Sequence, residues 1–359
     1  MAHMDIFNDD AFTMGQLIDT IERVPYQPGL LGRLNLFRPV PVRTEFVAIE
    51  EKAHTLAIIQ TSARGAPLEQ GRTNKRKLRR FDTTRLAKGD KITAAEVQGI
   101  RAIGSETELM QVQDVVVEKQ TTLRSDMELT FENHRLGAVQ GKVLDADGTV
   151  IYNWFTEWGI AEPTPIEFKL DTASTDVERL IRTQVLRAMQ RASKGLWVPG
   201  TYAAALCGDS FFDKLTGHKT VRETYLNTIQ AAALRNAFGV AAEQMDGTFA
   251  TYWYGGVLFI NYRGVDDFDD NATSGVTSIG IKSTEAKFFP VNAPGVFQKA
   301  LSPGEGIDDV NTPGREIYSE LEMEKRNNPR FVDLEIYSYP LYVCTRPEIL
   351  LRAVENTNP

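Results

Sequence analysis

The longest regular pattern in the chain lies between Glu106 and Ala138, where apolar residues recur at helical spacing and no proline interrupts them. The apolar stripe consists of Val112, Val116, Leu123, Met127, Phe131 and Ala138. This periodicity predicts one helix of about 30 residues, roughly 45 Å long, because an α-helix rises about 1.5 Å per residue. We expect Gly141 to end it.

The residues after this helix predict a β-hairpin. Two short apolar runs, 142–144 and 149–152, flank the sequence Asp145-Ala146-Asp147-Gly148. Asp-Gly is a common turn dipeptide because glycine adopts a positive φ without steric cost. A calcium loop also begins with spaced aspartates, but its later ligands are missing here, so a plain turn is favoured.

Weaker patterns predict the remaining elements. Helices are expected at 14–21, 93–101, 176–193 and 220–236, strands at 44–49, 202–207, 257–262, 278–282 and 331–343, and a short terminal element at 350–354. The helix at 93–101 would begin with a capping box made by Thr93 and Glu96. The elements between about 173 and 295 indicate a mixed α/β domain, followed by a loop rich in Gly, Pro and Asp at 303–314.

Residues 63–91 depart from these patterns, because their only large apolar residues are Leu68, Leu78, Phe81 and Leu86. The same segment holds six cations within nine residues: Arg72, Lys75, Arg76, Lys77, Arg79 and Arg80. Such a segment buries too little apolar surface to offset the entropy of ordering it. Since it lies between foldable stretches, we expect it to take its order from a partner.

The charge balance indicates what that partner is. The formal net charge is −8, and the six cations contribute +6, so the rest of the chain carries −14. An acidic body with a basic segment can pair head to tail with copies of itself. The densest acidic stretch is the candidate contact, and it contains Asp266, Asp267, Asp269 and Asp270.

Two other interpretations of the basic segment stay open. One is a solvated loop without a partner. The other is a nucleic-acid-binding protein, because closely spaced Lys and Arg displace counterions from phosphates. Phe81 is the only aromatic residue there that can stack on bases, and the body is acidic, so docking onto a protein is favoured.

The acidic stretch also has an alternative, since paired carboxylates can bind a cation and act as acid and base in a cation-dependent hydrolase. No His-Glu-x-x-His, paired-cysteine, Gly-x-Ser-x-Gly or dinucleotide motif accompanies it. His54, His134 and His218 lie far apart in unrelated contexts. We therefore expect an exposed acidic loop, no cofactor, no metal and no enzymatic activity.

Composition sets the broad class. At 359 residues, 42% hydrophobic and 25% charged, the chain suits a soluble globular protein of two or three domains. Its apolar runs are too short to span a bilayer, so no membrane partner is expected. Cys207 and Cys344 lie in separate apolar contexts, which favours reduced core cysteines. Residues 1–3 look like a cloning remnant.

Several short motifs occur in an order and at a spacing that are similar to those of a known family. They are Phe12-Thr13, Gln16-Leu17-Ile18, Pro28 to Leu31, Leu34, Leu36-Phe37-Arg38, Pro41, Thr44-Glu45, Val47, Arg79-Arg80, Pro329-Arg330-Phe331, Ser338-Tyr339-Pro340-Leu341 and Arg346-Pro347. In order and spacing they resemble the lambda-type major capsid (major head) protein family of tailed bacteriophages and prophages. The resemblance extends from Met4 to Val354.

The resemblance implies an α+β fold, the tailed-phage major capsid protein fold. Its parts would be an N-terminal arm at 1–50, an extended loop with its base at 51–105, a peripheral domain with spine helix and hairpin at 106–172, an α/β axial domain at 173–295, and a return to the peripheral domain at 296–359. The arm and the loop would reach neighbouring subunits.

The resemblance also implies a structural subunit of an icosahedral head that encloses double-stranded DNA without sequence-specific binding. Copies of the chain would exchange arms and loops in hexamers and pentamers, with scaffold, portal and decoration proteins as further partners. The protein would assemble in the bacterial host cytoplasm and remain in the virion capsid. The basic residues 72–80 would then serve contacts between subunits, with exposure toward the packaged DNA as the alternative, and the acidic residues 266–270 stay the contact suggested by the charge balance.

Overall fold

The computed structural model describes residues 28–52, 76–93, 96, 108–227, 249–262, 264, 279–325 and 330–356. Its helices are α1 (Leu30–Arg33), α3 (Glu108–Gln140), α4 (Trp154–Trp158), α5 (Val177–Leu180), α6 (Arg187–Ala192), α7 (Asp209–Gly217) and α8 (Lys219–Asn227). Its strands are β1 (Arg38–Pro41), β2 (Phe46–Lys52), β3 (Arg76–Asp82), β4 (Leu86–Thr93), β5 (Lys142–Leu144), β6 (Val150–Asn153), β7 (Ile166–Glu167), β8 (Tyr202–Cys207), β9 (Thr251–Tyr254), β10 (Val257–Asn261), β11 (Glu285–Val291), β12 (Phe297–Leu301), β13 (Tyr318–Met323), β14 (Phe331–Ser338), β15 (Pro340–Cys344) and β16 (Leu351–Val354).

Helix α3 confirms the long helix predicted from apolar periodicity, and it contains 33 residues. The predicted stripe is buried at Val116, Leu123, Met127, Phe131 and Ala138. Gly141 follows the helix with a φ of +84°, in the left-handed region that favours glycine. The predicted hairpin is confirmed as well, with β5 and β6 paired antiparallel.

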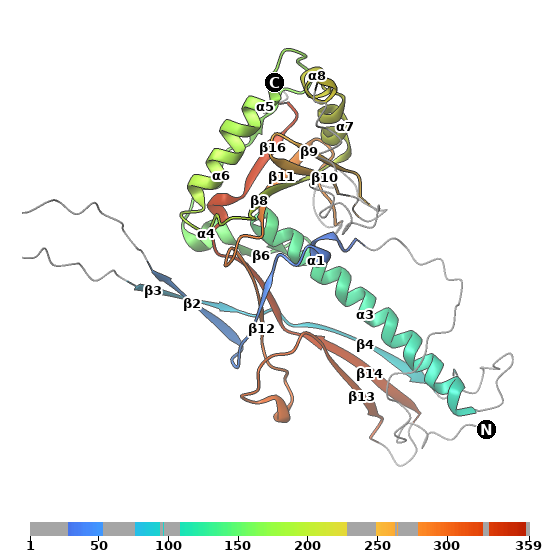
Figure 1. The fold of residues 1–359 in the computed structure, drawn as a ribbon. Helices are drawn as coiled ribbons and strands as arrows, with labels where there is room; N and C mark the ends of the chain where they lie inside the picture. The colour runs from blue at the N-terminus through green and yellow to red at the C-terminus, as the bar shows by residue number, and fades with distance from the viewer. Residues whose placement is uncertain are drawn as a thin grey trace, which may run out of the picture.

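One face of α3 packs on a three-stranded sheet with the order β13-β14-β4, and Figure 1 shows the helix running alongside β4 and β14. Near one end of the helix a small separate core forms from Ile92, Val116 and Val332. There Lys119 also bonds Asp90 at 3.2 Å, tying the helix to β4. The sheet therefore supports the helix over much of its length.

A six-stranded sheet with the order β7-β16-β11-β8-β10-β9 forms the second large unit. Strand β8 lies in its middle, with Ala203 to Cys207 fully buried, as expected from its unbroken apolar run. In Figure 1, α5 and α6 lie along one side of this sheet and α7 and α8 along the other. Strands β7 and β16 join it from outside the 173–295 range.

The predicted helix at 176–193 is confirmed as one continuous segment with a π-helical stretch at Ile181–Leu186 between α5 and α6. Asp176 caps it by accepting a hydrogen bond from the Arg179 amide at 2.9 Å. The capping box at Thr93 and Glu96 also has its two reciprocal bonds, at 2.9 and 3.3 Å. The helices predicted at 14–21 and beyond Asn227 lie outside the described residues.

Three predictions are wrong. No strand lies at 279–282, because the chain there is irregular, with a bend at Gly280, and β11 begins only after the turn at 283–284, at Glu285. The strand predicted at 331–343 is two strands, divided at Tyr339, which pair in different sheets. Residues 76–82 and 86–91 were expected to lack their own order, yet they form β3 and most of β4 because β2 and β14 supply pairing partners.

Two further expectations concern the core and membranes. Cys207 and Cys344 are free and fully buried, as predicted for reduced core residues. None of the described helices combines the length and the apolar character that crossing a membrane requires.

Candidate interaction surface

Strands β2 and β3 form a two-stranded antiparallel ribbon that extends away from the rest of the described chain (Figure 1). Paired residues of such a ribbon share a face, and successive residues alternate between faces. The inner face includes Val47 opposite Phe81, and both are buried. Phe81 packs against Tyr152, Trp154 and Trp158, with ring centroids 5.3 to 5.9 Å apart. This aromatic cluster fixes the base of the ribbon.

Arg79 lies on the same inner face and bonds the end of α4. Its guanidinium donates to the carbonyl oxygens of Glu157 and Trp158, the second at 3.4 Å, and stacks 5.2 Å from the Trp158 ring. These carbonyls belong to the last turn of α4, where backbone acceptors have no partner within the helix. A planar guanidinium supplies two donors with the spacing this requires. Arg79 is therefore used within its own subunit.

The outer face of the ribbon is open in the isolated chain. Leu78 is 69% exposed, which is high for a large apolar residue. Arg80, on the same face, stacks 3.9 Å from the Phe46 ring and pairs with Asp82 at 3.1 Å, with both charged side chains mostly exposed. Exposed pairs contribute little stability, so Arg80 can exchange partners at small cost.

The structure places only part of the predicted contact. Arg72, Lys75 and the four aspartates Asp266, Asp267, Asp269 and Asp270 lie outside the described residues, and Arg76 is described only as backbone of β3. Lys77 is exposed, whereas Arg79 and Arg80 have the contacts given above. The described residues therefore do not bring the basic segment and the acidic stretch together.

A buried carboxylate, missed in the sequence, holds the start of α1 on α3. Glu132 accepts hydrogen bonds from the amides of Leu31 at 2.8 Å and Gly32 at 3.1 Å, and pairs with Arg135 at 3.3 Å. Burial raises the pKa of Glu132, while the two amides and Arg135 oppose the rise. Leu30 and Leu31 are fully buried beside it, so this point joins the N-terminal segment to the spine helix.

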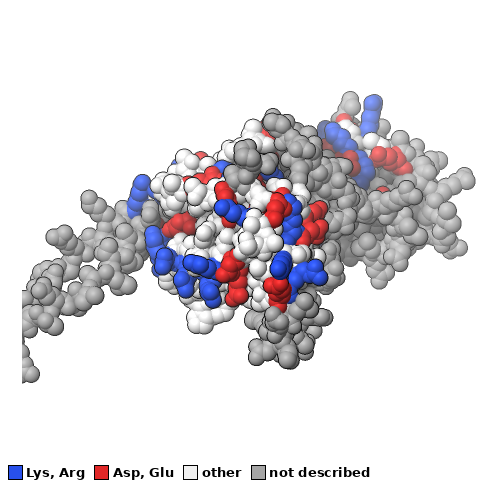
Figure 2. Space-filling view, turned by 90° about the horizontal axis from the view of Figure 1, so that it is seen from above, with Lys and Arg blue, Asp and Glu red and all other residues white. Residues whose placement is uncertain are grey.

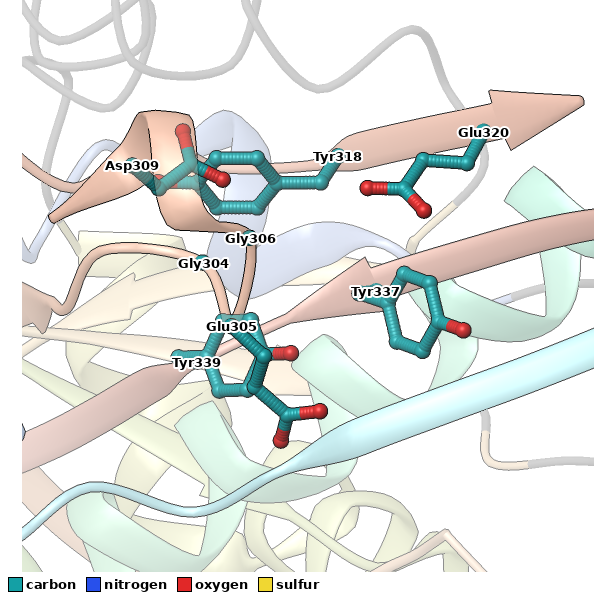
Figure 3. A pocket seen from close by; sticks show the side chains of 8 residues that line it. All are labelled: Gly304, Glu305, Gly306, Asp309, Tyr318, Glu320, Tyr337 and Tyr339. Atoms are coloured by element: carbon teal, nitrogen blue, oxygen red, sulfur yellow. The ribbon is translucent and has the colours of Figure 1, made fainter.

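A second missed feature is an acidic hollow of about 210 Å³ on the loop predicted at 303–314. Its acidic side chains are Glu305, Asp309 and Glu320, and its aromatic ones are Tyr318, Tyr337 and Tyr339. In Figure 3, Asp309, Tyr318 and Glu320 lie on one side of the opening, and Glu305, Tyr337 and Tyr339 lie on the other. We call this the tyrosine pocket. Alternating Tyr and Glu on β13 and β14 is the only sequence signal for it.

The described charges are otherwise intermixed. Figure 2 shows Lys and Arg beside Asp and Glu in small groups over the face seen from above. Nucleic-acid-binding proteins usually gather one sign of charge in a stripe. Nor do the described residues contain a group of three or more His, Cys, Asp or Glu side chains placed to hold a metal ion.

Comparisons with known proteins agree over nearly the whole chain. A family model described as phage major capsid protein E matches residues 13–354. The major capsid protein of Pseudomonas phage KPP10 is 30% identical over 95% of this chain and 96% of its own. That of Salmonella phage Felix O1 is 26% identical over 95% of each chain.

Solved structures show the same fold. The capsid structure of cyanophage P-SCSP1u matches with a TM-score of 0.52, at 9% sequence identity, over 97% of this chain and 92% of that one. At this identity the likeness is one of architecture alone. The α+β organisation predicted from the sequence is thereby confirmed as a tailed-phage capsid fold.

Proposed function

Because this chain belongs to the phage major capsid protein E family, we propose that it builds its shell by exchanging an N-terminal arm and an extended loop with neighbouring copies. The protein is a major capsid protein, a structural subunit of the virion shell, and not an enzyme. Copies of it associate with one another in that shell. The nucleic-acid-binding alternative is not favoured, because the relatives are shell subunits and Arg79 bonds its own chain.

The ribbon is the observation that carries the exchange. Its base is fixed by Phe81 and Arg79, while its outer face exposes Leu78. The ladder runs from Phe46–Asp82 to Lys52–Arg76, so residues 53–75 join the strands at the end remote from Phe81. Because the base of the ribbon is fixed on its own subunit, the direction in which the loop extends toward a neighbour is also fixed.

The two large units support an assignment of domains. We assign 106–172 and 296–359 to a peripheral domain, around α3 and the β13-β14-β4 sheet, and 173–295 to an axial domain, around the six-stranded sheet. The proposed assemblies are hexamers and pentamers formed in the bacterial host cytoplasm. Scaffold, portal and decoration proteins are the proposed partners, and double-stranded DNA is the proposed content.

Removing the extended loop tests the exchange. Lys52 and Arg76 are paired across the ladder, so Asn-Gly in place of 53–75 closes the ribbon with a tight turn and leaves both strands intact. We expect this variant to fold, with an unchanged circular dichroism spectrum, and to form no closed shells. Sedimentation and negative-stain electron microscopy of nuclease-treated protein measure the outcome.

A matched control variant keeps the length of the segment 53–75 and removes its side chains. Replacing 53–75 with a Gly/Ser linker of equal length retains the reach of the loop but none of its side chains. We expect it to fail as the deletion does. Closed shells from the deletion variant would contradict loop exchange, while leaving the family assignment in place.

A further inference from the structure

Two surfaces of the described chain expose large apolar residues beside opposite charges. One is the outer face of the ribbon, where Leu78 is 69% exposed beside Arg80. The other is the short turn after Gly306, where Ile307 is 91% and Val310 is 72% exposed. Soluble proteins rarely leave such side chains uncovered in groups, and groups of them mark interaction sites.

The turn also carries negative charge. Asp308 and Asp309 lie between the two exposed apolar residues; Asp308 is exposed and Asp309 is half-buried. Asp309 also lines the tyrosine pocket, which opens directly beside the turn. An apolar contact at Ile307 would thus bring a cation of the partner to the mouth of the pocket.

The pocket already binds a guanidinium at its rim. Arg85 donates to the Glu305 carboxylate at 2.7 Å and lies 5.3 Å from the Tyr337 ring. Carboxylate and aromatic ring together suit the charge and the flat face of an arginine. Asp309 and Glu320 are further carboxylates in the same pocket, and neither has an ion-pair partner among the described residues.

The spacing on β3 fits these features. Leu78 and Arg80 are two positions apart on one face, which places their Cα atoms roughly 6.6 Å apart in an extended strand. With Leu78 against Ile307 and Val310, the long side chain of Arg80 is within reach of the adjacent pocket. Leu78 and Ile307 are both exposed in the single chain, so they do not cover each other there.

We propose that the outer face of the ribbon in one copy docks on the 305–310 turn of a second copy. Leu78 contacts Ile307 and Val310, and Arg80 enters the tyrosine pocket beside Asp309 and Glu320. The two surfaces differ, so the contact is heterologous and propagates around a ring rather than closing a dimer. This inference rests on the proposed function and names the surface that receives the base of the extended loop.

Engineered cysteines test the contact directly, because Cys207 and Cys344 are fully buried and give little background. L78C protein is assembled with an equal amount of I307C protein and mildly oxidised. We expect at least tenfold more disulfide-linked dimer than from L78C with V150C. Val150 is a matched control, since it is 55% exposed on the β5–β6 hairpin.

Charge changes test the pocket separately. We expect R80E to lower the yield of shells at least tenfold, and R191E, the same change at an exposed arginine of α6, to lower it less than twofold. Adding E320R to R80E should restore at least half of the yield. Equal losses from R80E and R191E, or no rescue, would overturn the placement of Arg80.

The outcomes separate this contact from the proposed function. Closed shells in which L78C links to I307C no better than to V150C would overturn the contact and leave the shell function standing. Absence of any shell or ring from the unmodified chain, with or without its own capsid partners, would contradict the proposed assembly and the contact together.

Discussion

The backbone amide of Leu31 donates a hydrogen bond to the buried carboxylate of Glu132 at 2.8 Å, although the two residues are 101 positions apart. The carboxylate also accepts the Gly32 amide, so it binds free N–H groups in the first turn of α1. The side chain of Glu132 on α3 thereby fixes the position of α1, the first helix of the described chain.

Replacing Glu132 with alanine should lower the free energy of unfolding by about 3 kcal/mol, because Arg135 loses its buried partner and two amides lose their acceptor. Glu128 on the same helix is the control. Its pair with Arg124 is exposed, so its alanine variant should lose less than about 1 kcal/mol. Urea unfolding of unassembled chains measures both, and equal losses would contradict a capping role.

The stability of the chain should fall in mild acid because of His134. Burial lowers the pKa of this side chain from 6.5 to about 4. Between these values the unfolded chain binds a proton at His134 that the folded chain does not. The neutral side chain therefore makes its full contribution to the free energy of unfolding above pH 6.5, and this contribution is lost as the pH falls toward 4. From pH 7 to pH 5 the loss should be about 2 kcal/mol.

Comparing the chain with its His134→Gln variant isolates this effect. The raised pKa of Glu132 acts in the opposite direction, because it favours the folded state as the pH falls. The difference between the two proteins in unfolding free energy, measured at pH 7 and pH 5, removes that contribution. The same pH dependence in both would show that His134 is not its source.

Arg79→Lys should loosen the ribbon without unfolding the subunit. Lysine keeps the charge but cannot bond the carbonyls of Glu157 and Trp158 with a planar fork. A loss of 1–2 kcal/mol should speed amide hydrogen exchange in β2 and β3 by roughly 5- to 30-fold. Arg80→Lys, on the exposed face, should change it less than about twofold.

Gly141→Ala should be costly for two reasons. Its φ of +84° strains any other residue, and a methyl group there would collide with the Phe155 ring. The expected loss in unfolding free energy is about 2–4 kcal/mol. Gly148→Ala is the control, because its φ is +81° but no atom lies within 4 Å of the added carbon, so about 1 kcal/mol is expected.

The thiols should resist modification in the native protein. Burial raises the pKa of Cys344 to about 12 and also raises that of Cys207. The thiolate is the reactive form, so a thiol reagent should label the folded chain roughly a hundredfold more slowly than the urea-unfolded chain. Fast labelling of either residue in the folded protein would contradict its burial.

The sequence predicted those helices and strands whose own residues show a clear apolar pattern. Helix α3 shows an unbroken stripe, and Tyr202–Cys207 shows a buried apolar run. At 278–282, where a strand was predicted, Ile279 and Ile281 are buried, both at most 5% exposed, but no strand forms. Alternation of apolar and polar residues indicates which side chains are buried, but it does not show whether a neighbouring strand is available for pairing. The strand β11 begins three residues later, at Glu285.

The site was harder to predict because its parts are distant in the chain. The order of β3 depends on pairing with β2 and on aromatic residues near 152–158. In the sequence, the cations of residues 72–80 therefore could not be told apart by role. In the structure, Arg79 bonds the end of α4 in its own chain, whereas Arg80 faces outward. The tyrosine pocket likewise joins residues 305–309 to β13 and β14, which no local pattern connects.

The final stretch of the chain supplies one strand to each of three sheets. Strand β14 sits between β13 and β4, β15 completes the sheet of β1 and β12, and β16 lies between β7 and β11. During synthesis, none of the three sheets can be completed before residues 331–338 have left the ribosome, and the six-stranded sheet needs residues up to 354. A nascent or truncated chain therefore lacks a finished subunit to add to a growing shell, and translation itself sets the earliest moment at which incorporation begins.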